Sequence, residues 1–274
     1  MASTRSAPAR PAAKGPARKA AGARTRRYAV VHDIDGPRVR LGLLWFVVAL
    51  GALIAGPLAT AALYATTAAI AAAQTARTWR RRGDRPNEFF AAAMAGATGL
   101  GACLGAGGAG LGILAGVALA LVGATGGRRS MQPLIADAGW TIQCALVPGL
   151  AAASMVLLAR LDQGSAIALL LLVSAFDTGD FLIGSGSRNR FEGPLAGLAA
   201  ILVITFIVST LPVSALDFDQ AWLFGGLVAV LAPAGQLLAS ALLPDAAAPA
   251  SALRRLDSML LAAPIWCWGV GLVI

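Results

Sequence analysis

The chain has 274 residues, of which 58% are hydrophobic and only 13% are charged, and its net charge is +9. This composition is too apolar for an ordinary soluble domain, and the mean hydropathy is +0.74. The apolar residues also occur in long blocks, without the alternation that is typical of a barrel strand. The sequence therefore predicts an all-α, polytopic helical membrane protein.

The first segment, residues 1–27, contains eight Arg or Lys residues and no acid, separated by Ala, Pro, Gly and Ser. Such a composition cannot bury a core, so we expect a disordered cytoplasmic tail that is attracted to anionic lipid. We favour lipid over nucleic acid as its partner. No apolar core follows within the usual length of a signal peptide, so cleavage is not expected. Residues 28–40 form a juxtamembrane segment.

Nine apolar blocks follow in residues 41–274, and each is close to the about 20 residues that a membrane-spanning helix needs. The blocks cover residues 41–57, 58–76, 88–104, 107–124, 139–159, 164–184, 194–212, 220–243 and 258–274. The sequence therefore predicts about nine transmembrane helices in one domain. The boundary at Gly56-Pro57 is compatible with either a turn or a kink.

The charged links between these blocks predict the orientation. With nine spans, 21 of the 22 Arg and Lys residues fall on one side, and only Arg160 falls on the other. The positive-inside rule then places the N-terminus in the cytoplasm and the C-terminus outside. We expect an integral protein of a bacterial plasma membrane.

Two carboxylates lie at the end of the sixth apolar block. Asp177 and Asp180 are three residues apart, so they share a helical face. An acid at the centre of a membrane costs about 2.5 kcal/mol or more, and such residues are functional candidates by default. The next link contains glycines with Arg188 and Arg190, which together could cradle a phosphate. Alternatively, the acids are solvated at the helix end and pair with these arginines.

A second set of polar residues lies near the C-terminus. Gln236 and Ser240 are four residues apart and share one helical face, and Asp257 and Ser258 precede the last apolar block. The alternative for Asp257 is an ordinary helix cap, which stabilises a helix by about 1 kcal/mol.

Several stretches together resemble the CDP-diacylglycerol synthases, which are also called phosphatidate cytidylyltransferases. Five stretches of this chain match the family's motifs in the same order: DTGDF (177–181), GSG (184–186), RFEG (190–193), GQLLAS (235–240) and LRRLDSMLLAAP (253–264). The last is the most specific match. The stretch AAIAAAQTARTWRRRGDRP (68–86) also resembles the first cytoplasmic loop of the family, with Gln74 where a glutamate is common. The resemblance covers about residues 60–274.

The resemblance implies that the phosphate of phosphatidic acid attacks the α-phosphorus of CTP, so that CDP-diacylglycerol and pyrophosphate form. It implies Mg²⁺ as the cofactor, and CTP, phosphatidic acid and membrane lipid as partners; a homodimer is also compatible with it. On this interpretation the catalytic and metal-binding residues are Asp177, Asp180 and Asp257, with Gln236 as a further metal ligand. The residues expected to bind substrate phosphate are Arg188, Arg190, Arg255, Ser240 and Ser258.

The chain differs from the family's pattern at two acidic positions. Gln236 and Arg254 each stand where the family has an aspartate, and the family's lysines are absent or reduced to arginines. A neutral amide binds a divalent cation less well than a carboxylate does. Asp180 is a candidate for the missing acid. The alternative is an inactive family member that acts as a lipid-binding or partner membrane protein, and a transporter or scaffold is the third hypothesis.

Overall fold

The structure is a computed structural model, and it describes residues 38–125, 131–185, 189, 191–211 and 215–274. The predicted basic tail and most of the juxtamembrane segment lie outside the described residues, as do Arg188 and Arg190. Every regular element in the described part is a helix, which confirms the all-helical prediction.

The helices follow the predicted apolar blocks in chain order. Their bounds are α2 Arg38–Ala55, α3 Pro57–Arg80, α4 Glu88–Gly101, the 3₁₀ turn η1 Ala102–Leu104, α5 Ala106–Thr125, α6 Met131–Leu161, α7 Gln163–Gly184, α8 Glu192–Thr210, α9 Phe218–Leu242, α10 Leu253–Leu256 and α11 Met259–Val273. The largest difference is α6, which begins well before the predicted residue 139.

Six membrane spans, rather than nine, are supported by helix length and composition within the described residues. They comprise α5, α6 from Leu134, α7, α8, α9 and the continuous segment Leu253–Val273. The apolar parts of α2 and of α4 with η1 are shorter, Leu41–Ala55 and Glu88–Leu104. Helix α3 is long enough, but it is rich in Ala and Thr and ends in polar residues, so its hydropathy is lower. The chain is therefore a helical protein with several membrane-spanning segments.

The Gly56-Pro57 boundary is a turn that separates two helices. Gly56 has a φ of 108°, a left-handed conformation that glycine adopts without strain. Pro57 then occupies the first position of α3, where its missing N–H costs nothing. The hydroxyl of Thr60 donates to the carbonyls of Ala52, at 3.2 Å, and Gly56, at 3.0 Å. These bonds tie the first turn of α3 to the end of α2 and to the turn between them.

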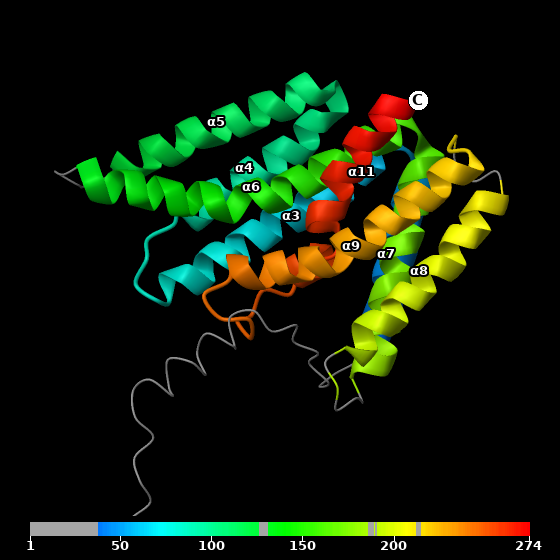
Figure 1. The fold of residues 1–274 in the computed structure, drawn as a ribbon. Coiled ribbons are helices and arrows are strands. Elements are labelled where there is room, and N and C mark those ends of the chain that lie inside the picture. Colours follow the sequence, from blue (N-terminus) through cyan, green and yellow to red (C-terminus); the bar gives the residue numbers. More distant parts are fainter. Residues whose placement is uncertain (1–37, 126–130, 186–188, 190, 212–214) are drawn as a thin grey trace, which may run out of the picture.

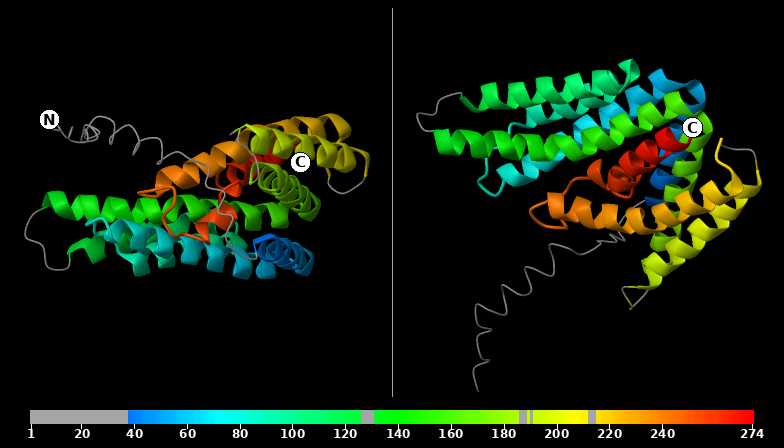
Figure 2. Two further views of the ribbon diagram at one scale, coloured as in Figure 1. Left: turned by 90° about the horizontal axis from the view of Figure 1, so that it is seen from below. Right: turned by 45° about the horizontal axis from the view of Figure 1, so that its top comes forward.

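The helices form two groups that the C-terminal helix joins (Figure 1). Helices α3, α4, α5 and α6 pack side by side in the first group, and α7, α8 and α9 pack together in the second. Both views in Figure 2 show the same division. Helix α11 contacts α6 of the first group and α9 of the second, and α2 lies against α3 and α7. A residue at the start of α11 is therefore close to both groups.

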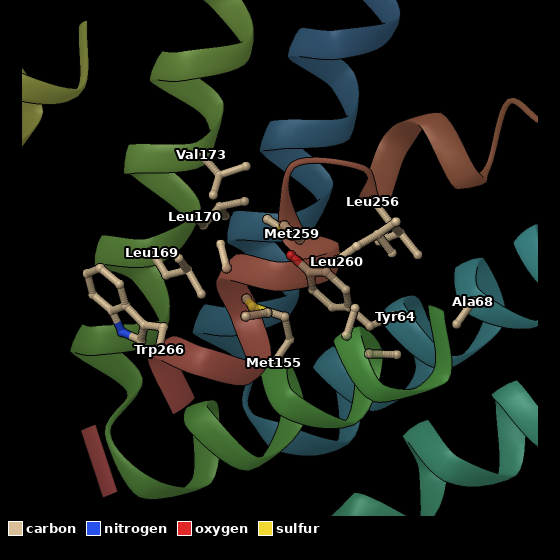
Figure 3. Packing of buried hydrophobic residues seen from close by; sticks show 14 of the residues in the cluster. Tyr64, Ala68, Met155, Leu169, Leu170, Val173, Leu256, Met259, Leu260 and Trp266 are labelled. Atoms are coloured by element: carbon tan, nitrogen blue, oxygen red, sulfur yellow. The ribbon is translucent and has the colours of Figure 1, made fainter. Parts of the chain in front are cut away.

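The core lies where these two groups meet, and it combines small and large side chains (Figure 3). Alanines such as Ala68 line the buried side of α3, which lets neighbouring helices approach closely in the membrane. Val173 of α7, Leu256 of α10 and Met259 of α11 are buried in the same cluster. Because Val173 is one turn before Asp177, and the other two residues flank Asp257 and Ser258, this core holds the predicted acidic residues in place.

Candidate functional site

The last turns of α7 contact the start of α11 through a carboxylate. The hydroxyl of Ser258 donates a hydrogen bond to Oδ1 of Asp177, which is 81 residues earlier in the chain. Ser258 is buried, whereas Asp177 is half-buried. The same hydroxyl lies 3.5 Å from Oδ1 of Asp257. Ser258 therefore bridges two carboxylates that belong to different segments.

The last turns of α7 also contact α9. Nε2 of Gln236 donates to Oδ2 of Asp180 at 3.5 Å, and the two side chains are only 7% and 3% exposed. Oε1 of Gln236 is a buried acceptor for which the described part of the chain provides no hydrogen bond. A buried oxygen of this kind is costly unless a ligand or a water molecule completes it, so Oε1 of Gln236 is a candidate ligand atom.

A third contact joins α9 to α10. Nη1 of Arg254 donates to Oγ of Ser240 at 3.1 Å, and Nη2 donates to the carbonyl of Ala246 at 2.8 Å. The Ser240 hydroxyl donates in turn to the carbonyl of Gln236 at 3.1 Å. Nη1 of Arg254 also lies 3.9 Å from Oδ2 of Asp257. The guanidinium is thus held by three different neighbours.

These three contacts form a closed ring of segments, which we name the acidic site. The end of α7 contacts the α10–α11 junction, the same end contacts α9, and α9 contacts the α10–α11 junction. Its residues are Asp177, Asp180, Gln236, Ser240, Arg254, Asp257 and Ser258. The segments DTGDF, GQLLAS and LRRLDS therefore meet in one place, although they are far apart in the sequence.

Two glycines allow the helix backbones to approach within this site. A Cβ atom on Gly235 would lie 2.3 Å from the carbonyl oxygen of Asp257, so only glycine lets α9 pack this closely. A Cβ atom on Gly193 of α8 would lie 2.5 Å from Oδ1 of Asp180 and 2.9 Å from Cα of Gly184. The two glycines thus belong to the geometry of the acidic site, because any larger residue would displace its acids.

A fourth segment supports the site from α3. Oε1 of Gln74 accepts a hydrogen bond from the amide of Ala252 at 2.9 Å, and its Nε2 lies 3.4 Å from Oγ of Ser251. Nε1 of Trp79 donates to the carbonyl of Leu242 at 2.8 Å. These bonds anchor both ends of the link between α9 and α10, and this link leads directly to Arg254.

The carboxylates of the acidic site are close enough to repel one another. The Ser258 hydroxyl contacts both Asp177 and Asp257, and Asp180 follows Asp177 by three residues on α7. Placing such charges among membrane-spanning helices is unfavourable unless donors and cations compensate them. Arg254 provides one positive charge beside Asp257. The hydroxyl of Ser258, the amide of Gln236 and the backbone N–H of Ser258 provide donors.

Oxygen donors of this kind match the chemistry of a hard cation such as Mg²⁺. In the described part of the chain, however, no three His, Cys, Asp or Glu side chains are placed to hold a metal ion together. Mg²⁺ is usually held by one or two carboxylates, with water and substrate phosphate completing its ligands. Asp177 and Asp257, with the unused Oε1 of Gln236, fit that arrangement better than an all-protein cage.

The other predicted site residues have different surroundings. The hydroxyls of Ser240 and Ser258 are buried and already bonded within the site, which favours support of the site over direct phosphate contact. The guanidinium of Arg255 is directed towards α2, with Nη1 3.7 Å from the position that a Cβ on Gly42 would take. Arg188 and Arg190 lie outside the described residues.

The structure also bears on the two simpler alternatives from the sequence. Asp180 is buried and Asp177 is held by Ser258, so neither side chain is simply solvated at the end of a helix. Asp257 directly follows α10, and the residue before α11 is Ser258, whose side chain makes no capping bond. Asp257 is therefore not an ordinary N-terminal cap of the last helix.

Sequence reasoning assigned no role to Arg254 or Gln74. Arg254 is three residues before Asp257, a spacing at which opposite charges meet on a helix, so an ion pair was predictable. Gln74 lacks such a signal, because its partners, Ser251 and Ala252, are more than 170 residues away in the chain. Only the packing of α3 against the α9–α10 link shows its role.

Comparison with models of protein families and with curated proteins finds no match for the chain. The acidic site and the three segments that meet there are therefore the main guide to function.

Proposed function

We propose that the chain is a membrane-embedded cytidylyltransferase that transfers a cytidylyl group from CTP to phosphatidic acid. The observation that carries this proposal is the closed ring of contacts between the three segments that resemble the motifs of the CDP-diacylglycerol synthases. Chance matches in a long apolar sequence have no reason to meet through polar side chains. A shared site is the arrangement that a single reaction requires.

The reaction needs little covalent chemistry from the protein. A phosphate oxygen of phosphatidic acid forms a bond to the α-phosphorus of CTP, and the bond to the bridging oxygen of the β-phosphate breaks. Pyrophosphate leaves with that electron pair. The main tasks of the protein are to orient the two phosphates and to stabilise their charge.

The acidic site could perform these tasks with its own residues. Asp177 and Asp257 would hold Mg²⁺, which when bound would neutralise charge on the phosphates of CTP. Gln236 and Ser258 would keep the carboxylates in position through the bonds described above. Asp180 lies beside Gln236 and would supply the acid that is missing there. Arg188 and Arg190 would bind substrate phosphate through bidentate hydrogen bonds.

A direct assay tests this proposal. The full-length protein would be purified in detergent and incubated with labelled CTP, phosphatidic acid and Mg²⁺. We expect CDP-diacylglycerol and pyrophosphate to form in equal amounts, and we expect Asp257→Asn to abolish nearly all turnover, because it removes a ligand charge and little volume. If wild type forms no product with any nucleoside triphosphate, the enzyme proposal is wrong.

An inactive relative that binds lipid or a partner protein is the second candidate. Two observations favour it: a neutral Gln236 contacts Asp180, and a guanidinium lies against Asp257. Such a protein would bind phosphatidic acid in vesicles without consuming CTP. The assay above therefore separates the two candidates when it is run alongside vesicle sedimentation.

We further propose nine spans in a bacterial plasma membrane, with the N-terminus in the cytoplasm and the C-terminus outside. The distribution of basic residues supports this orientation. Reporter fusions after residues 84, 128, 188 and 254 should all be cytoplasmic. An external signal from any one of them would contradict the scheme.

A further inference from the structure

Both carboxylate oxygens of Asp257 already have neighbours. Oδ1 accepts a hydrogen bond from the backbone N–H of Ser258 at 2.9 Å, and Oδ2 lies 3.9 Å from Nη1 of Arg254. The side chain of Asp257 is only 14% exposed. A cation that approached this carboxylate would therefore meet a positive charge at Oδ2.

The guanidinium of Arg254 is held firmly in this place. Its two terminal nitrogens donate to different acceptors, Oγ of Ser240 and the carbonyl oxygen of Ala246. Ser240 is fully buried. Arginine stays protonated in proteins, so this charge cannot be removed by a change of pH in the ordinary range. The site thus contains a permanent cation within ion-pair distance of one of its acids.

We propose that Arg254 is the resident cation of the acidic site and neutralises Asp257 as long as no substrate phosphate is bound. The chain would then bind a free divalent cation weakly and would need a substrate phosphate to hold it. This inference rests on the proposed function only for the nature of that phosphate. The competition between Arg254 and a metal ion for Asp257 is independent of any reaction.

The physical basis is the strength of charge interactions in a partly buried site. An opposite charge within about 4 to 6 Å changes the proton affinity of a carboxylate by about tenfold or more, and a competing cation should be affected similarly. Removing the guanidinium would leave Asp257 without its ion pair. The buried and unused Oε1 of Gln236 would be a further oxygen ligand in the same site.

Mn²⁺ binding to the full-length protein in detergent tests this inference. The free Mn²⁺ would be measured by electron paramagnetic resonance, with neither nucleotide nor phosphatidic acid present. We expect weak binding by wild type and binding that is about tenfold or more tighter in Arg254→Gln. Arg254→Lys retains the charge and should remain weak. Adding Asp257→Asn to Arg254→Gln should remove the gain.

Arg255→Gln is the matched control, because it removes the same charge from the same short helix. Its guanidinium is directed towards Gly42, so it should alter Mn²⁺ affinity much less than Arg254→Gln does. A folded Arg254→Gln protein, with wild-type elution and melting, that binds Mn²⁺ no tighter than wild type would overturn the inference. Equal gains in the Arg254→Lys and Arg254→Gln variants would also overturn it, because charge would then not be the cause.

If Arg254→Gln does not fold, wild type and Asp257→Asn decide the question. Equal, weak Mn²⁺ affinity in these two proteins supports the inference, because Asp257 is then not available to the metal. Tight binding by wild type that is lost in Asp257→Asn contradicts it. The Mn²⁺ measurement contains no substrate. Its outcome can therefore be interpreted even if the cytidylyltransferase assay is negative.

Discussion

The two ends of α7 each carry aspartate, but the surroundings of these residues differ. Asp162 precedes the first residue of the helix, and its carboxylate accepts hydrogen bonds from the backbone N–H of Ser165 at 2.8 Å and from its hydroxyl at 2.6 Å. The amide of Ala215 donates to the same oxygen at 3.2 Å. The helix dipole favours an acid at this position, so Asp162 is stabilised mainly by its own helix.

The acids at the other end lie far from the start of the helix, so its dipole does not stabilise them. Asp177 and Asp180 are seven and four residues before the last residue of α7, so no free N–H group of a helix start is available to them. Their donors, Ser258 and Gln236, come from other segments. Acids that local structure does not favour, and that distant residues hold in position, are the better functional candidates. The comparison therefore separates a capping aspartate from two candidate site residues.

The largest expected effect is on turnover. Asp177→Asn should lower the rate of CDP-diacylglycerol formation by about 100-fold or more, because it removes a charge from the site and weakens the bond to Ser258. Asp162→Asn is the matched control at the other end of the helix, and it should keep the wild-type rate. Labelled CTP measures both rates. If both variants lose turnover equally, Asp177 is no better a candidate for a site residue than the capping Asp162.

The second largest effect is expected on stability, from a substitution at the close contact between Gly193 and Asp180. Gly193→Ala should lower the free energy of unfolding by about 1 to 3 kcal/mol, because the new methyl group meets Asp180 and the backbone of Gly184. Gly139→Ala is the control, because nothing lies within 4 Å of its new Cβ. Thermal unfolding in detergent compares them. A Gly193→Ala protein as stable as wild type would show that α8 packs less closely on α7.

A smaller effect is expected from the capping end. Asp162→Ala should cost about 1 kcal/mol, since it removes the acceptor for the first turn of α7. Ser165→Ala removes only one of the bonds and should cost less. The free energies of unfolding of the two variants and wild type can be compared in the same detergent. A larger loss in Ser165→Ala than in Asp162→Ala would contradict the capping role.

The smallest effect is a pH dependence at the same end. Burial raises the pKa of Asp162, but the hydrogen bonds from Ser165, Ala215 and Gly164 outweigh it and hold the pKa below its ordinary value of 3.8. A lowered pKa stabilises the fold above 3.8, and this contribution is lost as the pH falls through the lower, folded value. Wild type should therefore lose more stability than Asp162→Asn between neutral pH and about pH 3. The melting temperatures of both proteins would be measured as a function of pH. If the two profiles run parallel, Asp162 makes no such contribution.

The sequence by itself determined the class of fold and the order of its helices. Long apolar blocks require helices in a membrane, because only helices satisfy their own backbone groups there. Glycine and proline at 56 and 57 indicated a break, and the acids of DTGDF and LRRLDS indicated polar positions in apolar surroundings. The sequence alone did not determine the number of spans, because α2, α3 and α4 are short or weakly apolar and their placement depends on their neighbours.

Only the tertiary structure decided which polar groups contact each other. The contacts of Asp177 with Ser258 and of Asp180 with Gln236 join residues 81 and 56 positions apart, and no local pattern specifies such partners. The sequence also does not indicate the roles of Gly193 and Gly235, because these depend on close contacts with atoms of another segment. Local periodicity specifies which face of a helix is polar. The packing of α11 between two helix groups determines what that face meets.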